Sequence, residues 1–282
     1  MRSLFLLFVT LFIGAACNTK TATTSSGSIS ATAPFVWETA FPKDILVSVA
    51  FSTPDEQTKI TAMMTAWETG AAGYDFFREV SPGTEPERTD TITGPNQLRD
   101  GKFAIYKATQ WPYPEFPDAL AITQIFAIRY NRGESSEYVA IQEADVIMNY
   151  EDFLFDDASP MAFDYDFQTV LLHELGHFLG LQHKPRSYNR NNTVMYPSIY
   201  SQSLEVKQVP QLIDRQDLAS KYSITLPPLT AGGSAIATSP RTYTRNPSDA
   251  GEMTKIVLEL RANGECVHHA DGVEFTRHQM NK

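Results

Sequence analysis

Hydrophobic residues in this chain recur at two different periods, and the change between them predicts the order of its elements. Ile60, Met63, Met64 and Trp67 lie at helical spacing, which predicts a helix that begins at Pro54 and ends near residue 70. Residues 211–222 predict a later helix, and residues 252–261 predict a last one. Short apolar and β-branched runs predict strands at residues 44–51, 74–80, 103–107, 122–130 and 138–150.

The stretch LLHELGHFLGLQH carries the densest candidate chemistry of the chain. His173 and His177 are four residues apart, so on a helix they project from one face and can bind one Zn²⁺. Glu174 lies between them and can act as a general base toward a water molecule at the metal. Gly180 can end the helix, because glycine tolerates the left-handed conformation, and the turn would return His183 as a third ligand.

The full H-E-x-x-H-x-x-G-x-x-H pattern, followed by Met195 within the letters VMYP, resembles the metzincin metalloproteases and their matrixin branch. Astacins and serralysins have a tyrosine two residues after this methionine, whereas this chain has Pro197. The resemblance covers about residues 41–222. Four further parts match more weakly. Residues 62–80 resemble the family's first helix and second strand, and residues 143–149 resemble the strand that borders the cleft. Residues 163–164 resemble the approach to the zinc helix, and residues 214–222 resemble the closing helix.

The resemblance implies an α+β fold with a twisted mixed sheet, an active-site helix and a C-terminal helical subdomain after the Met-turn. It implies that catalytic Zn²⁺ is held by the three histidines, that Met195 forms an apolar floor beneath them, and that Glu174 is the base in peptide-bond hydrolysis. Polypeptide substrates would add as an extra strand beside residues 144–149. Animal matrixins are often inhibited by a propeptide cysteine. Because no propeptide-sized segment precedes Phe41, we expect an enzyme made active or inhibited by another group.

An alternative of a different class is a non-catalytic, zinc-stabilised surface binding lipoprotein built on the same fold. Glu174 argues against this alternative, because a protein that only binds its target does not need a base. Hydrolysis of a peptide with and without a chelator would distinguish the two.

The first sixteen residues have the pattern of a signal peptide: Arg2, an apolar run over residues 4–13 and three small residues. Cys17 follows directly, which resembles a bacterial lipoprotein anchor site, although an ordinary signal peptide stays open as an alternative. Residues 17–40 are rich in Ser, Thr and Ala and predict a flexible tether. We therefore expect export, with membrane attachment at the cell envelope through a lipid on Cys17, or otherwise secretion.

Charge and composition limit the kinds of partner that the protein can bind. The net charge of −10 argues against nucleic acid as a partner, because nucleic-acid binding depends on clustered Lys and Arg. We expect the protein to be a monomer. The acidic side chains in residues 151–166 could bind Ca²⁺, although a solvated loop with an N-capping aspartate explains them as well. With Cys17 and Cys266 as the two cysteines, the fold is not stapled by disulfides, and a bridge between them is open only if Cys17 carries no lipid.

The sequence predicts a protease domain over residues 41–226. Pro227 and Pro228 begin a linker, and residues 227–282 form a linker and an extension to which the sequence assigns no role. We therefore expect the extension to be dispensable for the chemistry. His268 and His269 are adjacent and would not share a helix face, so a second metal site is not expected there.

Overall fold

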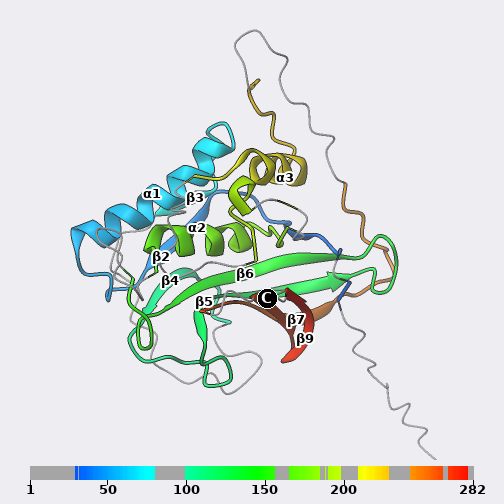
Figure 1. The fold of residues 1–282 in the computed structure, drawn as a ribbon. Helices are drawn as coiled ribbons and strands as arrows, with labels where there is room; N and C mark the ends of the chain where they lie inside the picture. The colour runs from blue at the N-terminus through cyan, green and yellow to red at the C-terminus, as the bar shows by residue number, and fades with distance from the viewer. Residues whose placement is uncertain are drawn as a thin grey trace, which may run out of the picture.

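The computed structural model describes residues 29–30, 32–79, 99–155, 165–184, 188, 190–197, 209–228, 242–262 and 266–278. Within these ranges, one mixed sheet forms the centre of the molecule (Figure 1). Helices α1 (Pro54–Gly70), α2 (Phe167–Phe178) and α3 (Leu212–Tyr222) lie on one side of the long strands in that view. The α+β class and the twisted mixed sheet expected from the resemblance are confirmed.

The sheet has a parallel half and an antiparallel half, and its strand order is β3-β2-β4-β6-β5-β7-β8-β9. β1 also pairs with β6, in parallel. The parallel strands are β1 (Phe35–Trp37), β2 (Lys43–Val47), β3 (Phe77–Glu79), β4 (Phe103–Ala108) and β6 (Tyr138–Asn149). Each following strand runs antiparallel to its neighbour, in the order β5 (Ala119–Tyr130), β7 (Glu252–Arg261), β8 (Cys266–Ala270) and β9 (Val273–His278).

Helix α1 has both the start signal and the buried face that its sequence predicts. Thr53 and Glu56 form a capping box at its N-terminus, so two backbone N–H groups that lack helical partners are hydrogen-bonded. The four predicted apolar positions are its buried residues. One of them, Trp67, donates from its indole nitrogen to the carbonyl oxygen of Leu172 at 3.0 Å, which fixes α1 against α2.

The predicted helix at residues 252–261 is wrong, because this segment is strand β7. It pairs antiparallel with β5 from Ala119 to Arg129, and its apolar side chains are buried against that sheet. Glu, Met, Lys and Leu favour a helix in isolation, but the edge of β5 offers a row of backbone hydrogen-bonding partners and an apolar face. Tertiary pairing therefore outweighs local propensity.

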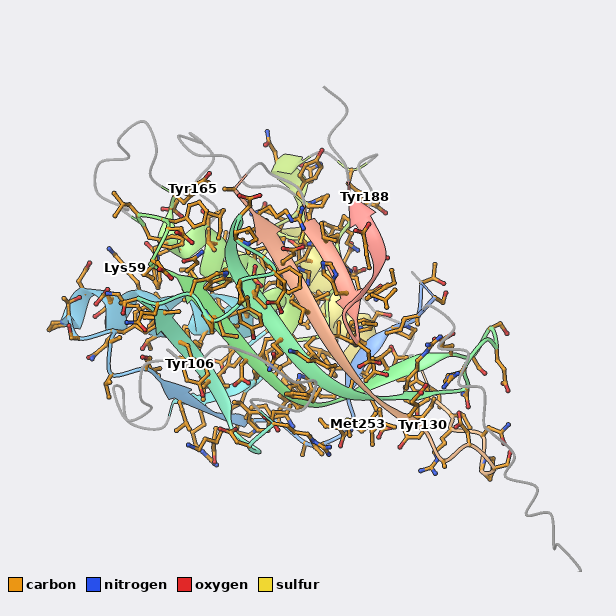
Figure 2. The ribbon with its side chains drawn as sticks, turned by 90° about the horizontal axis from the view of Figure 1, so that it is seen from below. Lys59, Tyr106, Tyr130, Tyr165, Tyr188 and Met253 are labelled. Carbon is orange, nitrogen blue, oxygen red and sulfur yellow. The ribbon has the colours of Figure 1, made fainter. Side chains whose placement is uncertain are left out.

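The C-terminal strands belong to the same sheet as the rest of the protein, although the sequence placed residues 227–282 in a linker and an extension. Figure 2 shows Met253 of β7 beside Tyr130 of β5 at one end of the pair. At the other end, the hydroxyl of Tyr165 donates to the carbonyl oxygen of Ala262 at 3.0 Å. Similarly, β1 lies within the segment that the sequence assigned to a tether, and it pairs with β6.

The prediction that residues 144–149 border a substrate cleft is wrong as well. Residues 146–148 of β6 pair with β4 on one side and with β5 on the other, so this part of β6 has no edge for a further strand. The strand beside α2 that begins the antiparallel half is β5, and its second edge is covered by β7.

Several predicted features lie outside the described residues. The predicted signal peptide, Cys17 and half of the predicted tether fall in residues 1–28, and part of the acidic loop falls in residues 156–164. Among the residues that the structure does describe, no helix is long and apolar enough to cross a membrane.

We expect truncation after residue 226 to destabilise the protein. It removes Ile256, Leu258, Leu260 and Cys266, which are fully buried in the main core. Each apolar side chain of this kind contributes about 1.5–3 kcal/mol, and 1 kcal/mol corresponds to roughly 2–4 °C in a domain of this size. The unfolding midpoint should fall by about 10 °C or more in a thermal scan. A soluble truncated protein with an unchanged midpoint would contradict the packing described above.

Candidate metal centre

Helix α2 is fixed at both ends, and this sets the direction of its histidines. Asp166 caps the N-terminus by accepting from the backbone N–H of Thr169 at 2.6 Å. The predicted stop at Gly180 is confirmed, since its φ is +80°. A Cβ atom there would lie 2.4 Å from the carbonyl oxygen of Phe35, so both the backbone conformation and the close approach of β1 require glycine.

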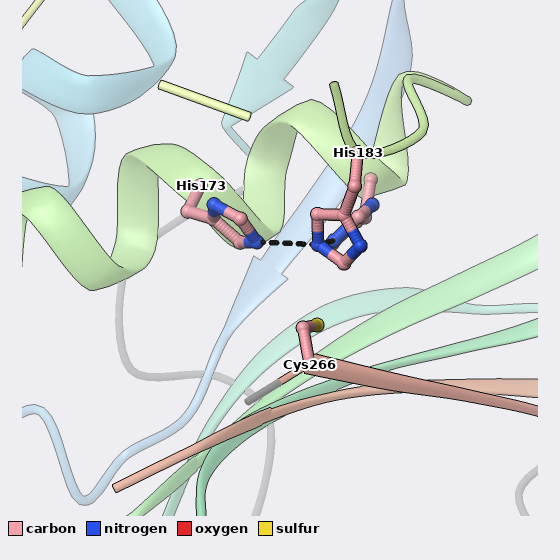
Figure 3. Close-up of side chains that lie close together, drawn as sticks. His173, His183 and Cys266 are labelled. Carbon is pink, nitrogen blue, oxygen red and sulfur yellow. Dashed lines mark hydrogen bonds between the residues drawn. The ribbon is translucent and has the colours of Figure 1, made fainter. Parts of the chain in front are cut away.

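The three histidines of the motif meet below α2. The Nε2 atom of His183 lies 3.1 Å from Nε2 of His173 and 3.0 Å from Nε2 of His177, and all three side chains are buried. Figure 3 shows His173 and His183 facing each other across this point. The turn at Gly180 therefore returns His183 to the helix, as its sequence spacing predicts.

The outer nitrogens of two of these rings have fixed partners. Nδ1 of His173 donates to the carbonyl oxygen of Val194 at 2.8 Å, and Nδ1 of His177 donates to that of Leu181 at 2.9 Å. Carbonyl groups only accept, so in the neutral rings both Nε2 atoms carry lone pairs that point into the cluster. Hydrogen bonds of this kind fix the tautomer and orientation that a metal-binding histidine needs.

This arrangement fits a zinc ion. Converging lone pairs repel one another unless a shared proton or a cation lies between them. In tetrahedral coordination with Zn–N distances of about 2.0–2.1 Å, ligand nitrogens lie about 3.3 Å apart, close to the two separations found here. Among the described residues, His173, His177, His183 and Cys266 are the one group of three or more His, Cys, Asp or Glu that could hold an ion, with ligand atoms within 4.8 Å of one another.

Glu174 is fully buried beside the three rings. Its Oε2 atom accepts from the hydroxyl of Thr123 at 2.5 Å, and among the described residues its Oε1 atom has no hydrogen-bond partner. Burial raises the pKa of Glu174 to about 8, and the hydrogen bond from Thr123 opposes this rise. A cation at the three Nε2 atoms would favour the ionised form, which is the form that can accept a proton.

Met195 is buried and lies beside α2, and its place beneath the three rings stays a prediction. A Cβ atom on Gly176 would come 2.3 Å from the sulfur of Met195, so a side chain at this position would displace the methionine. Asp214 of α3 holds the preceding residues: it accepts from the hydroxyl of Thr193 and from the backbone N–H of Val194, the latter at 2.8 Å. Through Val194, this buried carboxylate supports the carbonyl group that orients His173.

Two residues near the rings were missed by the sequence analysis, and both come from β8. Nε2 of His268 lies 2.8 Å from Nδ1 of His183, and Cys266 is a buried free cysteine beside the cluster (Figure 3). Burial raises the pKa of the Cys266 thiol, and the negative charges of Glu174 and Glu259 add to this effect. The sequence feature that could have identified them is the spacing of two positions between Cys266 and His268, which places both side chains on one face of a strand but not of a helix.

His268 has a defined role if the three rings bind one cation. All three Nε2 atoms must then be free of protons, so His183 carries its proton on Nδ1 and donates it to Nε2 of His268. His268 thus supplies for His183 what backbone carbonyl groups supply for the other two rings.

The acidic residues near α2 have other partners where they are described. Asp166 is the N-cap of α2, Asp152 accepts from the side chain of Asn149 at 3.1 Å, and Glu151 accepts from the backbone N–H of Trp111. Asp156, Asp157 and Asp164 lie outside the described residues, so the Ca²⁺ site stays a prediction.

Comparison with known families agrees with this geometry. Residues 95–222 match the model of the matrixin family, a range that begins before β4 and ends with the last residue of α3. This part of the chain is therefore a matrixin-like metzincin domain. A search of curated proteins found no match. Strands β7, β8 and β9 lie beyond the matched range.

We expect His268→Ala to weaken metal binding, because loss of the group that orients a ligand histidine typically costs roughly 10–100-fold in affinity. His268→Gln should restore part of this affinity, since its amide oxygen can still accept from Nδ1 of His183. His269→Ala is the matched control: this neighbour contacts Glu259 at 2.9 Å and not the cluster. A competition titration with a chromophoric chelator measures all three variants, and equal affinities for His268→Ala and the control would refute the role of His268.

Proposed function

We propose that the protein is an exported, zinc-dependent endopeptidase with Glu174 as its general base. The observation that supports this most strongly is the convergence of the three Nε2 atoms beside a fully buried carboxylate. The matrixin family uses zinc and acts on polypeptides, which gives the metal and the substrate class.

A bound zinc ion supplies a Lewis acid that polarises the scissile carbonyl group and lowers the pKa of a water molecule. Glu174 accepts the proton of the attacking water at its carboxylate and passes it to the leaving amine. The hydroxyl of Thr123 holds Oε2 of Glu174, which leaves Oε1 as the atom that can take this proton. Met195, which is buried, would form an apolar floor beneath the three rings, as it does in the family that the chain resembles.

A second candidate function has specific support and is kept. In a non-catalytic protein the same histidines would bind zinc only to stabilise the fold. Cys266 beside the rings, and β7 along the edge of β5, favour this alternative because both restrict access to the centre.

We expect Glu174→Ala and His183→Ala to fail in different ways. Glu174→Ala removes the base but no ligand, so about one zinc per chain should remain while turnover falls by roughly 10²- to 10⁴-fold. His183→Ala removes a ligand, and both zinc content and turnover should fall.

The measurement is metal content by elemental analysis beside hydrolysis of a quenched peptide, with and without a chelator. Thr58→Ala is a control substitution on the exposed side of α1. Wild-type turnover in Glu174→Ala, or a wild-type protein that binds no zinc, would rule out the protease. Zinc binding without hydrolysis in any variant would instead favour the non-catalytic alternative.

We also propose that Cys17 is the lipid-modified N-terminus of the mature protein. A cysteine carrying two or three acyl chains provides enough buried CH₂ groups for stable membrane anchoring. Cys17→Ser should therefore move the protein from the membrane fraction to the soluble fraction, as followed by immunoblotting. Mass spectrometry that finds an unmodified mature N-terminus at another residue would refute the anchor.

A further inference from the structure

The C-terminal strands cover the side of the metal centre where a peptide could pair with the sheet. Thr123, which holds Glu174, belongs to β5, so β5 is the strand that runs beside the centre. Among the described strands β5 has no unpaired edge, since β6 covers one side and β7 covers the other along ten residue pairs. A peptide that reaches the metal while β7 is in place must therefore bind without pairing to β5.

The chain then turns back as β8 and brings two side chains to the three rings. Cys266 and His268 share one face of this strand, and His268 contacts His183. The sulfur of Cys266 belongs to the group whose ligand atoms lie within 4.8 Å of one another. A tetrahedral pair of zinc-bound nitrogen and sulfur lies about 3.6 Å apart, so a side-chain shift of about 1 Å suffices for ligation.

The surroundings of Cys266 also indicate a ligand at this point. The thiol is fully buried and is a free cysteine in the structure. Glu174, with one carboxylate oxygen that lacks a partner among the described residues, is buried in the same space. Three imidazole nitrogens, a thiol and a carboxyl group gathered in one buried interior form a donor set that fits a metal cation.

We propose that Cys266 binds as the fourth ligand of the metal, so that the C-terminal strands hold the centre closed. This inference rests on the proposed function and adds its regulation. A site with three histidines and one thiolate has all four tetrahedral positions filled by protein, as structural zinc sites do, whereas a catalytic site keeps one position open. Hydrolysis is low while Cys266 occupies the fourth position and rises when Cys266 leaves the metal.

The closing element lies outside the part of the sequence that matches the matrixin family. β7, β8 and β9 lie beyond the residues that match the matrixin family, and residues 229–241 connect them to the domain over a long stretch of sequence. Since the apolar side chains of β7 pack into the main core, point substitutions at Cys266 are a cleaner test than removal of the segment.

The first measurement asks whether sulfur binds the metal. Metal-free protein carrying Cys17→Ser, in which Cys266 is the remaining cysteine, is loaded with one equivalent of Co²⁺. We expect a thiolate-to-cobalt charge-transfer band in the near ultraviolet, which Cys266→Ala and Cys266→Ser abolish. Zinc-edge X-ray absorption of the protein loaded with zinc instead should show one sulfur at about 2.3 Å besides nitrogen at about 2.0 Å. The X-ray measurement does not depend on whether the Cys266 variants fold.

A separate assay of peptide hydrolysis asks whether coordination by the Cys266 sulfur lowers activity. Cys266→Ala should raise peptide hydrolysis roughly tenfold or more over wild type, because it opens one coordination position. Val267→Ala is the matched control: it removes a buried side chain from the opposite face of β8 and should not activate the protein. Adding Glu174→Ala to Cys266→Ala should abolish the gained activity.

The outcomes separate this inference from the proposed function. Absence of sulfur from the metal overturns the inference, even if wild-type protein hydrolyses peptides and so remains a protease. Sulfur on the metal with equal hydrolysis in wild type and Cys266→Ala overturns closure, and so does equal activation by Val267→Ala. Sulfur on the metal with no hydrolysis in any variant supports the ligand and overturns the protease.

Discussion

The structure depends most on holding three imidazole rings so that their Nε2 atoms meet at one position. The close approach of His173, His177 and His183 fits a cation between them, and the hydrogen bonds of the outer nitrogens of His173 and His177 turn their lone pairs inward. Much of the surrounding fold supports this arrangement. The glycine turn after α2 returns His183, the loop before Met195 supplies the carbonyl group for His173, and α3 holds that loop through Asp214.

The C-terminal strands connect this centre to the rest of the sheet. They bury apolar side chains in the main core, cover the second edge of β5, and bring His268 and Cys266 to the rings. One segment therefore contributes stability, orientation of a ligand and restricted access at once. Because these contributions come from different side chains on β7 and β8, single substitutions can separate them.

The same arrangement relates the two candidate functions. A protease and a zinc-stabilised binding protein need the same three histidines, and they differ in whether a coordination position opens beside Glu174. The carboxylate is the feature that only a catalyst requires, whereas the thiol is the feature that keeps the centre closed. The proposed closure by Cys266 combines both features in one protein with two states.

The sequence by itself determined the metal centre, because its chemistry is local. The spacing of four positions from His173 to His177 is about one turn of helix, and Gly180 ends that helix wherever it packs, so the positions of Glu174 and His183 follow from spacing. Helix α1 and the central strands were likewise fixed by periodicity. Only the tertiary structure decided the role of the C-terminal segment. Its residues favour a helix when considered alone, and they form strands because β5 offers an unpaired edge more than a hundred residues away in the sequence. That pairing, which no local pattern encodes, places Cys266 and His268 beside the histidines.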